Sequence, residues 1–222
     1  MWTIVRHFKG ADYLQLGVAS HSEDLAKSIL YLSLYNNSVS SLWVRPKEMF
    51  LSLMENGTPR FKPLYLLRKA APADIPELLS FGYDAWGDGE PMTEFLESYN
   101  TDPNHLRGQR YLIEDMGGNI LANLNTLLLS KNVIGIASVA TKPSMRKKGY
   151  AALLLKAVME LLKLENPSYT FLLFSEISPT YYETLGFKPL PAQYQKFLPS
   201  VAMSNGNRSL QSDELALMEN YF

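Results

Sequence analysis

In the second half of the chain, the hydrophobic positions follow first the pattern of a buried strand and then the pattern of a helix. Residues 133–141 are almost all apolar and β-type, a pattern typical of a strand covered on both faces. From Tyr150 onward apolar residues recur every three or four positions, which predicts a helix with one apolar stripe that ends before Pro167. Between these segments residues 146–149 read Arg-Lys-Lys-Gly. The pattern therefore predicts a strand, a basic turn and a helix in direct succession.

A second strand and a short helix complete this unit. Residues 170–174 predict another buried strand, and a strand, a helix and a strand in that order imply a right-handed parallel crossover. A short helix is expected from Pro179; it carries Tyr181 and Tyr182 and breaks at Gly186. A basic turn alone is more often a solvated surface, and paired tyrosines more often pack, but the ordered set favours a binding site.

The residues before this unit predict two helices and a hairpin. A first strand is expected at residues 64–68, with helices at 74–83 and 90–99. Residues 110–114 and 120–130 predict a β-hairpin that leads into the strand of the basic turn.

The N-terminal residues predict a separate strand-rich unit. Its short β-type runs are residues 13–18, 29–35 and 41–44. Because Pro63 marks a junction, we expect one domain at residues 1–62 and a second at 63–222. The first should be a compact, barrel-like β unit held by four aromatic side chains, Tyr13, Trp43, Phe50 and Phe61.

Composition restricts the function. A chain of 222 residues with 46% hydrophobic content can bury an ample core, and a net charge of −1 provides no global field that would attract nucleic acid. The absence of cysteine removes disulfides, thiolate nucleophiles and thiolate metal ligands. Since the three histidines are far apart in the sequence, we expect no metal site. No run is long enough to span a membrane and no signal-peptide pattern begins the chain, so the expected location is the cytoplasm.

The basic turn supplies the chemistry of an anion site. A helix N-terminus presents unpaired backbone N–H groups and a positive dipole end, and three cations precede it in Arg146, Lys147 and Lys148. Gly149 leaves room for a phosphate to approach the backbone. The sequence therefore predicts a pyrophosphate-binding turn.

These residues resemble the GNAT superfamily of acetyl-CoA-dependent N-acetyltransferases. The matching residues are Arg146, Gly149 and Ala151 of an R-x-x-G-x-A signature, the strand end Val139-Ala140-Thr141 with Pro143, and Tyr182 to Phe187 of a Y-E-x-x-G-F pattern. The resemblance covers about residues 65–204. It implies an α/β (α+β) fold of the GNAT type, in which helices flank a mixed, mainly antiparallel sheet.

The resemblance also implies acetyl-CoA as co-substrate, with no metal. The cofactor-binding residues expected from it are Val139, Ala140, Thr141, Arg146, Lys147, Lys148, Gly149, Tyr150 and Ala151. The strand end should pair with the pantetheine arm as an added strand would, and the turn should hold the pyrophosphate.

The implied reaction is direct attack of a primary amine on the acetyl thioester. The backbone N–H of Val139 is expected to stabilise the oxyanion, and Tyr182 to protonate the departing CoA thiolate. Glu176, just past a predicted strand, is the preferred general base. Its rivals lie on the loop where the family shapes its acceptor pocket: Asp84, Asp88 and Glu90.

Residues 1–62 resemble a small bacterial family of unknown function. The matching residues include His7 to Gly10, Tyr13, Ala19 to Glu23, Leu42 to Pro46 and Pro59 to Phe61. His7, His21, Glu23 and Arg45 could serve acid–base work or phosphate binding. A binding surface is favoured over a purely structural role, and catalysis is the least favoured reading.

Other functions stay open at this point. A CoA-binding sensor or assembly protein could retain the GNAT fold without turnover, and the N-terminal unit could direct an enzyme to a macromolecule. The acceptor is open among polyamine, aminoglycoside, amino acid, protein N-terminus and lysine, with a small molecule favoured over a protein. No nucleic acid or membrane partner is expected, and a homodimer is left open.

Overall fold

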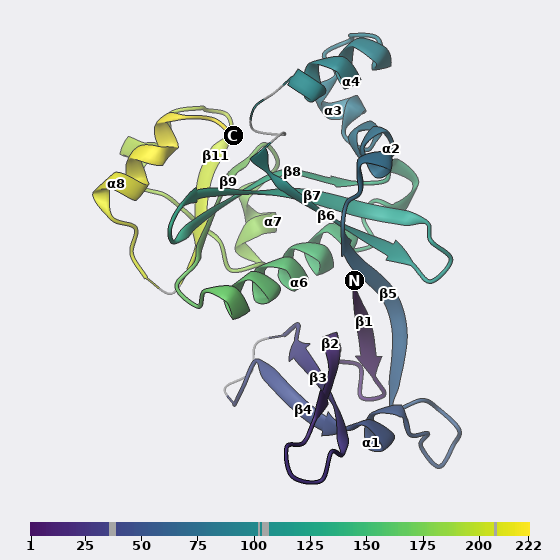
Figure 1. Cartoon of the computed structure of the whole chain (residues 1–222). Coiled ribbons are helices and arrows are strands. Elements are labelled where there is room, and N and C mark those ends of the chain that lie inside the picture. Colours follow the sequence, from purple (N-terminus) through teal and green to yellow (C-terminus); the bar gives the residue numbers. More distant parts are fainter. Residues whose placement is uncertain (36–38, 102, 104–106, 207) are drawn as a thin grey trace. The chain divides into compact units, whose positions relative to one another are not determined.

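The chain forms two compact units in the computed structural model, which describes residues 1–35, 39–101, 103, 107–206 and 208–222 (Figure 1). The first unit contains residues 1–69 and 112–121, and the second contains residues 70–111 and 122–222. The expected domain boundary between residues 62 and 63 stays a prediction. None of the helices among the described residues combines the length and the apolar character that crossing a membrane requires.

The first unit is strand-rich, as expected. Its elements are β1 (Trp2–His7), β2 (Asp12–Ser20), β3 (Lys27–Ser33), β4 (Leu42–Pro46), α1 (Lys47–Leu51) and β5 (Phe61–Lys69). Neighbouring strands pair antiparallel in the order β5-β1-β2-β3-β4. The three expected β-type runs correspond to β2, β3 and β4, while β1 and α1 were not expected.

Aromatic side chains form the core of the first unit. The rings of Phe50 and Phe61 stack with centroids 4.0 Å apart. Tyr31 meets both rings edge-on, and Tyr13 and Trp43 pack against the same cluster. The four aromatic residues expected to hold this unit are therefore all in its core cluster or in contact with it.

The four polar residues proposed as a second site do not all lie together. His7 lies against Phe61 with ring centroids 4.8 Å apart, and the guanidinium of Arg45 lies 5.9 Å from the same ring. Burial and the nearby cations lower the pKa of His7. His21 lies in the loop after β2, exposed, with Nδ1 3.0 Å from Asp24, and Glu23 is in the same loop. Only His7 and Arg45 thus share a neighbour.

The second unit contains the expected strand, turn, helix and strand. The elements that lie wholly or partly in the second unit are η1 (Pro72–Asp74), α2 (Ile75–Ser80), α3 (Tyr83–Trp86), α4 (Met92–Thr101), β6 (Gln109–Asp115), β7 (Ile120–Ser130), β8 (Val133–Thr141), η2 (Pro143–Met145), α6 (Tyr150–Glu165), β9 (Thr170–Ser175), α7 (Pro179–Glu183), β10 (Lys188–Pro189), η3 (Ala192–Tyr194), β11 (Val201–Asn205), α8 (Ser212–Leu215) and η4 (Ala216–Glu219). Residues 112–115 of β6 and 120–121 of β7 are counted with the first unit. The strand order is β10-β11-β9-β8-β7-β6. β8 and β9 run parallel, whereas β7 with β8, β9 with β11 and β10 with β11 are antiparallel. The sheet is therefore mixed and mainly antiparallel, as expected.

Both faces of this sheet are covered. Alternate residues of a strand point to opposite faces, and on β9 Phe171 lies under the ammonium of Lys163 from α6, whereas Leu172 packs in a cluster that includes Leu217 and Phe222. α6 runs along one face of the sheet (Figure 1). Residues 208–222 pack on the other face, an element that the sequence did not predict.

The helix expected over residues 74–83 ends earlier, with α2 at Ser80, and a second short helix, α3, begins at Tyr83. The break leaves Gly82 as the N-cap of α3, and the ring of Trp86 lies against it. A Cβ on Gly82 would lie 2.1 Å from that ring, so a glycine is required for the indole to approach the backbone this closely. This contact fixes the position of Trp86, which lines the cavity described below.

Candidate functional site

β8 and β9 run side by side for only three residue pairs. Their parallel pairing extends from Val133 with Thr170 to Gly135 with Leu172. β8 then continues to Thr141 with no strand partner on that side among the described residues. Its backbone N–H and C=O groups form an open edge there, and an extended chain can add to such an edge.

A β-bulge lies on the same part of β8. The register with β7 shifts between Asn123 and Asn125, so that Ser138 and Val139 both face the single residue between them. Ser138 has φ of 49°, a left-handed conformation that is uncommon for a residue with a side chain. A bulge takes its extra residue out of the ladder and bends the strand. Val139, the expected oxyanion donor, is one of the two bulge residues.

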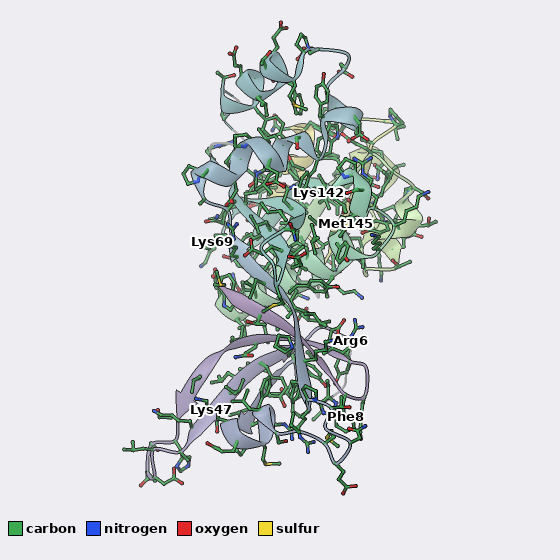
Figure 2. All side chains as sticks on the ribbon, turned by 90° about the vertical axis from the view of Figure 1, so that its right-hand side faces the viewer. Arg6, Phe8, Lys47, Lys69, Lys142 and Met145 are labelled. Atoms are coloured by element: carbon green, nitrogen blue, oxygen red, sulfur yellow. The ribbon has the colours of Figure 1, made fainter. Side chains whose placement is uncertain are left out.

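The turn that follows β8 presents a helix N-terminus to this edge. Lys142 and Met145 lie close together at η2, where the Met145 N–H donates to the Lys142 carbonyl over 2.8 Å (Figure 2). Lys147 and Gly149 both have left-handed backbone, with φ of 63° and 83°. Gly149 is the N-cap of α6 and provides no side chain to cap it. Consecutive backbone N–H groups in such turns form anion-binding concavities.

A phosphate group fits the space around Gly149. A Cβ added to this residue would meet nothing within 4 Å, so the approach to the backbone is open. All nine residues expected to bind the cofactor lie on the end of β8, in this turn or at the start of α6: Val139, Ala140, Thr141, Arg146, Lys147, Lys148, Gly149, Tyr150 and Ala151. Their role as ligands stays a prediction.

The side chain of Arg146 is engaged within the protein. Its guanidinium donates to both carboxylate oxygens of Asp84, at 2.5 and 2.7 Å, and to the carbonyl of Phe81 at 2.8 Å. This pairing lowers the pKa of Asp84 and raises that of Arg146. Asp84, a rival candidate for the general base, is therefore paired with the turn and favoured in its ionised form.

A cavity of about 330 Å³ opens beside the β8 bulge. Its aromatic lining residues are Trp86, Tyr99, Phe174, Tyr182, Tyr221 and Phe222. Ser138, Val139 and Glu176 also line it, and the hydroxyls of Tyr99 and Ser138 lie 2.8 Å apart. The expected acid, the expected base and the expected oxyanion donor thus share one cavity, whereas Asp88 and Glu90 are not among its lining residues.

Two neutral donors orient the Glu176 carboxylate. The indole Nε1 of Trp86 donates to Oε2 over 2.6 Å, and the hydroxyl of Tyr221 donates to Oε1. Burial raises the pKa of Tyr221 to about 12, with the hydrogen bond to Glu176 as the second cause, so the phenol keeps its proton at neutral pH. The carboxylate is accordingly held at the cavity wall with its charge uncompensated by any cation among the described residues.

Tyr182 and Tyr181 differ in their surroundings. Tyr182 is buried in the wall of the cavity, where burial raises the pKa of its phenol well above the usual range. Tyr181, its edge-on neighbour with ring centroids 5.0 Å apart, is half-buried and does not line the cavity. Burial raises the pKa of Tyr181 as well. Tyr182 therefore lines the cavity and Tyr181 does not, and the role of Tyr182 as proton donor stays a prediction.

Comparison with known families agrees with this geometry. The sequence profile of the acetyltransferase (GNAT) family matches residues 74–187, which include the open edge, the turn and Tyr182. The chain belongs to the GNAT acetyltransferase family. The profile of a family described as a protein of unknown function (DUF1653) matches residues 3–63. Both matches follow the order of the two resemblances found in the sequence, and the GNAT match is shorter than the expected range of about residues 65–204. No curated protein matched the sequence significantly.

Solved GNAT structures share the fold at low sequence identity. An acetyltransferase of the GNAT family from Staphylococcus aureus is 15% identical, with a TM-score of 0.50, covering 65% of this chain and 99% of that chain. A chimera of the Vibrio cholerae spermidine N-acetyltransferase SpeG with hSSAT is 16% identical, with a TM-score of 0.51 and the same coverage. ElaA from Escherichia coli is 14% identical, with a TM-score of 0.50, covering 64% of this chain and 99% of that chain. These likenesses establish the fold alone.

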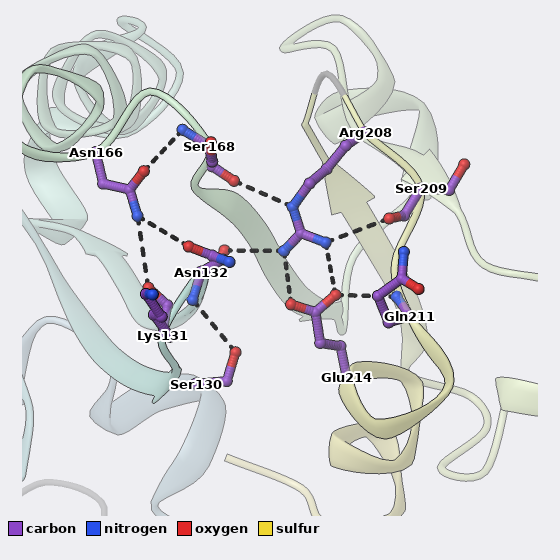
Figure 3. A network of polar contacts seen from close by, with 9 residues as sticks. All are labelled: Ser130, Lys131, Asn132, Asn166, Ser168, Arg208, Ser209, Gln211 and Glu214. Atoms are coloured by element: carbon purple, nitrogen blue, oxygen red, sulfur yellow. Dashed lines mark hydrogen bonds and ion pairs between the residues drawn. The ribbon is translucent and has the colours of Figure 1, made fainter.

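A polar clasp fastens residues 208–222 of this GNAT protein to its sheet (Figure 3). Arg208 donates to both oxygens of Glu214 at 2.6 Å, and to the carbonyls of Asn132 and Ser168 at 3.4 and 3.3 Å. Glu214 is buried and also accepts from the backbone N–H of Gln211. Arg208 lowers the pKa of Glu214 through these hydrogen bonds. The clasp positions the segment that brings Tyr221 to Glu176.

Sequence reasoning assigned a role to only three of the fifteen lining residues of the GNAT cavity, and those without one include Trp86, Tyr221, Phe222 and Asn125. Trp86 could have been found from the Gly82-Tyr-Asp-Ala-Trp86 spacing, because a glycine four residues before a tryptophan allows the ring to lie on the backbone. Tyr221 and Phe222 carry no local signal, since only the packing of residues 208–222 brings them to β9. Asn125 lies in the apolar β7 run; it is buried, and neither atom of its amide has a hydrogen-bond partner among the described residues.

Proposed function

We propose that the protein transfers an acetyl group from acetyl-CoA to a primary amine of a small molecule by direct attack. The observation that carries this proposal is the position of one cavity at the β8 bulge, lined by Tyr182, Glu176 and Val139. A sensor would need the turn that binds CoA. It would not need a buried phenol and an oriented carboxylate that line the same cavity as the strand end.

The open edge and the turn are suited to hold the co-substrate, which supplies an acetyl group activated as a thioester. Backbone groups of Val139 and Thr141 pair with the pantetheine amides. N–H groups from Lys147 to Ala151, with the dipole of α6, bind the pyrophosphate. The open space around Gly149 supports this assignment because phosphate oxygens can reach the backbone there.

Three groups of the protein act on the reacting atoms. The N–H of Val139 donates to the carbonyl oxygen as negative charge develops on it. Tyr182 gives its proton to the departing sulfur, and a phenol kept neutral by burial is available for this at pH 7. Glu176 accepts the proton that the amine nitrogen loses, directly or through water.

The proposal is tested with purified protein, acetyl-CoA and a panel of amines, with free thiol and acetylated product as separate readouts. We expect thiol release that requires both substrates and forms one acetylamine per thiol. Acetyl-CoA binding without turnover on any primary amine would instead favour the sensor function. A matched preparation of Gly149→Asp should lose turnover and binding together, which identifies the turn as the site used.

A further inference from the structure

The lining of the cavity is aromatic and acidic. Among its fifteen lining residues six are aromatic, one is a carboxylate, and none of those described is basic. We propose that this cavity selects a cationic alkylamine that carries no acidic group. This inference rests on the proposed acetyl transfer, because the same cavity would receive the acceptor.

The aromatic walls come from separate parts of the second unit. Trp86 is contributed by α3, Phe174 by β9, and Tyr221 with Phe222 by the segment after η4. The rings of Phe174 and Tyr221 stack with centroids 4.7 Å apart, which holds Tyr221 against β9. Ring faces attract an ammonium group, most strongly the face of tryptophan, and the attraction grows as water is excluded.

Glu176 gives the cavity a net negative charge. Its two oxygen atoms accept hydrogen bonds only from the neutral donors Trp86 and Tyr221 among the described residues. Neutral donors orient a carboxylate without cancelling its charge, so the negative field is available to a ligand. An ammonium group entering the cavity would supply the missing countercharge.

The same arrangement disfavours an acidic acceptor. A carboxylate or phosphate on the substrate would be placed near Glu176, and the described residues of the cavity wall include no lysine, arginine or histidine to pair with it. Two like charges in a partly desolvated space repel, and each also loses hydration. Selection therefore has an attractive and a repulsive component, as specific sites generally do.

The site is built in advance of binding. Trp86 is held against Gly82, and Tyr221 belongs to the segment fastened by Arg208 and Glu214. A ligand does not have to order these rings, so less entropy is lost when it binds. This rigidity predicts that a small cation is recognised even when it cannot react.

An unreactive pair of probes tests the inference without turnover. Choline and 3,3-dimethylbutanol have nearly the same shape, but only choline is charged. With the full-length protein saturated with CoA, we expect calorimetry to give choline at least tenfold tighter binding than the alcohol. Equal affinity for the two probes would overturn the proposal, whether or not the protein acetylates any amine.

Matched variants locate the effect. Glu176→Gln should weaken choline binding at least tenfold, with little effect on the affinity for 3,3-dimethylbutanol. Tyr221→Leu should weaken choline binding several-fold. Glu183→Gln is the control, because Glu183 is exposed on α7 and does not line the cavity. Circular dichroism and melting temperature confirm folding of each variant. An unchanged preference for choline in Glu176→Gln would contradict the inference.

A second experiment compares three amine acceptors that have the same carbon chain length. 1,4-Diaminobutane, butylamine and 4-aminobutanoate differ only in the far end of the molecule, which is cationic, neutral or anionic. We expect kcat/KM for either of the first two to exceed that for 4-aminobutanoate at least thirtyfold. If 4-aminobutanoate were preferred, acetyl transfer would stand and the selectivity would be wrong. If no amine reacted, the proposed function would fail while the choline measurement still decided the inference.

Discussion

The guanidinium of Arg146 is bonded by both of its terminal nitrogens to the carboxylate of Asp84. Arg146 begins the basic turn before α6, and Asp84 lies on α3, 62 residues earlier in the chain. A third hydrogen bond, to the carbonyl of Phe81, anchors the same guanidinium at the end of α2. The first residue of the GNAT signature therefore acts in this structure as a strut between the turn and the α2–α3 region.

If the contact between Arg146 and Asp84 supports the turn, Asp84→Asn should weaken acetyl-CoA binding. Removing the charge breaks the bidentate pair and leaves the turn less ordered. We expect calorimetry to show about a three- to tenfold loss of acetyl-CoA affinity. This loss is equivalent to about 1 kcal/mol, as expected for an exposed ion pair. Arg146→Gln should cost a similar amount.

The double variant distinguishes the strut from a direct phosphate ligand. If the arginine acts through Asp84, the two losses should not add, because either change breaks the same contact. If Arg146 instead bound the pyrophosphate, freeing it by Asp84→Asn would leave affinity unchanged or raise it.

The second prediction concerns Gly149. Gly149→Asp places bulk and negative charge against the expected pyrophosphate, and should weaken acetyl-CoA binding by more than about 2 kcal/mol through lost charge-assisted contacts. Left-handed backbone adds strain, since Gly149 has φ of 83°.

Gly118 provides a matched control for that strain. It has the same φ of 83°, and a Cβ added there also meets nothing within 4 Å. Gly118→Asp should lower the melting temperature about as much as Gly149→Asp while leaving acetyl-CoA affinity unchanged. Equal binding by both variants would place the pyrophosphate elsewhere.

Local patterns were enough to predict the elements around the cofactor turn. β8, α6 and β9 are long and strongly periodic, and their order fixes a parallel crossover, so their positions followed from the sequence within a few residues. The helix expected over residues 74–83 was less well predicted. It ends at Ser80, and the contact of Trp86 with Gly82 that follows is one that periodicity does not report.

For the same reason, the sequence predicted some residues of the cavity wall and not others. Val139 lies near the end of β8, Glu176 directly follows β9 and Tyr182 lies on α7, so the order of the elements was enough to expect them near one another. All three line the cavity, and their roles stay predictions. Tyr221 comes from a segment fixed by long-range polar contacts to Asn132 and Ser168, and no local pattern indicates such contacts. Residues brought together across the fold require the structure.

The third prediction concerns the clasp. Arg208→Gln removes the partner of buried Glu214 and should lower the free energy of unfolding by about 2 kcal/mol at pH 7, the value of hydrogen bonds to charged groups. KM for the amine should rise because Tyr221 is less well held, with acetyl-CoA affinity unchanged. Lys188→Gln, which removes an exposed cation on β10, is the control for charge alone.

The pH dependence gives the clasp a second test. Arg208 lowers the pKa of Glu214 in the folded protein, so the pair contributes stability above the ordinary glutamate pKa of about 4.3, and that contribution is lost as pH falls through the lowered folded value. The difference in unfolding free energy between wild type and Arg208→Gln should therefore be constant near neutrality and shrink below about pH 4. A difference that persisted unchanged in acid would show that the ion pair is not its origin.

The fourth prediction assigns the proton donor. Tyr182→Phe should lower kcat by about 10² or more while acetyl-CoA affinity stays within a few-fold, because only the transition state loses the donor. Burial raises the pKa of Tyr182, so it remains protonated throughout the neutral range. The rise of kcat/KM with pH should instead follow deprotonation of the amine, with pKa about 10.4, and the variant should keep this rise at a lower level.

Tyr181→Phe is the matched control for that experiment. Tyr181 is one residue away and about 100° around α7, and it lies outside the cavity wall, so the loss of its hydroxyl should leave kcat nearly unchanged. A larger loss in Tyr181→Phe, or near-full turnover in Tyr182→Phe with a good acceptor, would make Tyr182 a packing residue. If instead the alkaline rise disappeared in Tyr182→Phe, the phenol would be acting on the amine proton, and the donor to the thiolate would have to be sought among the other groups of the cavity.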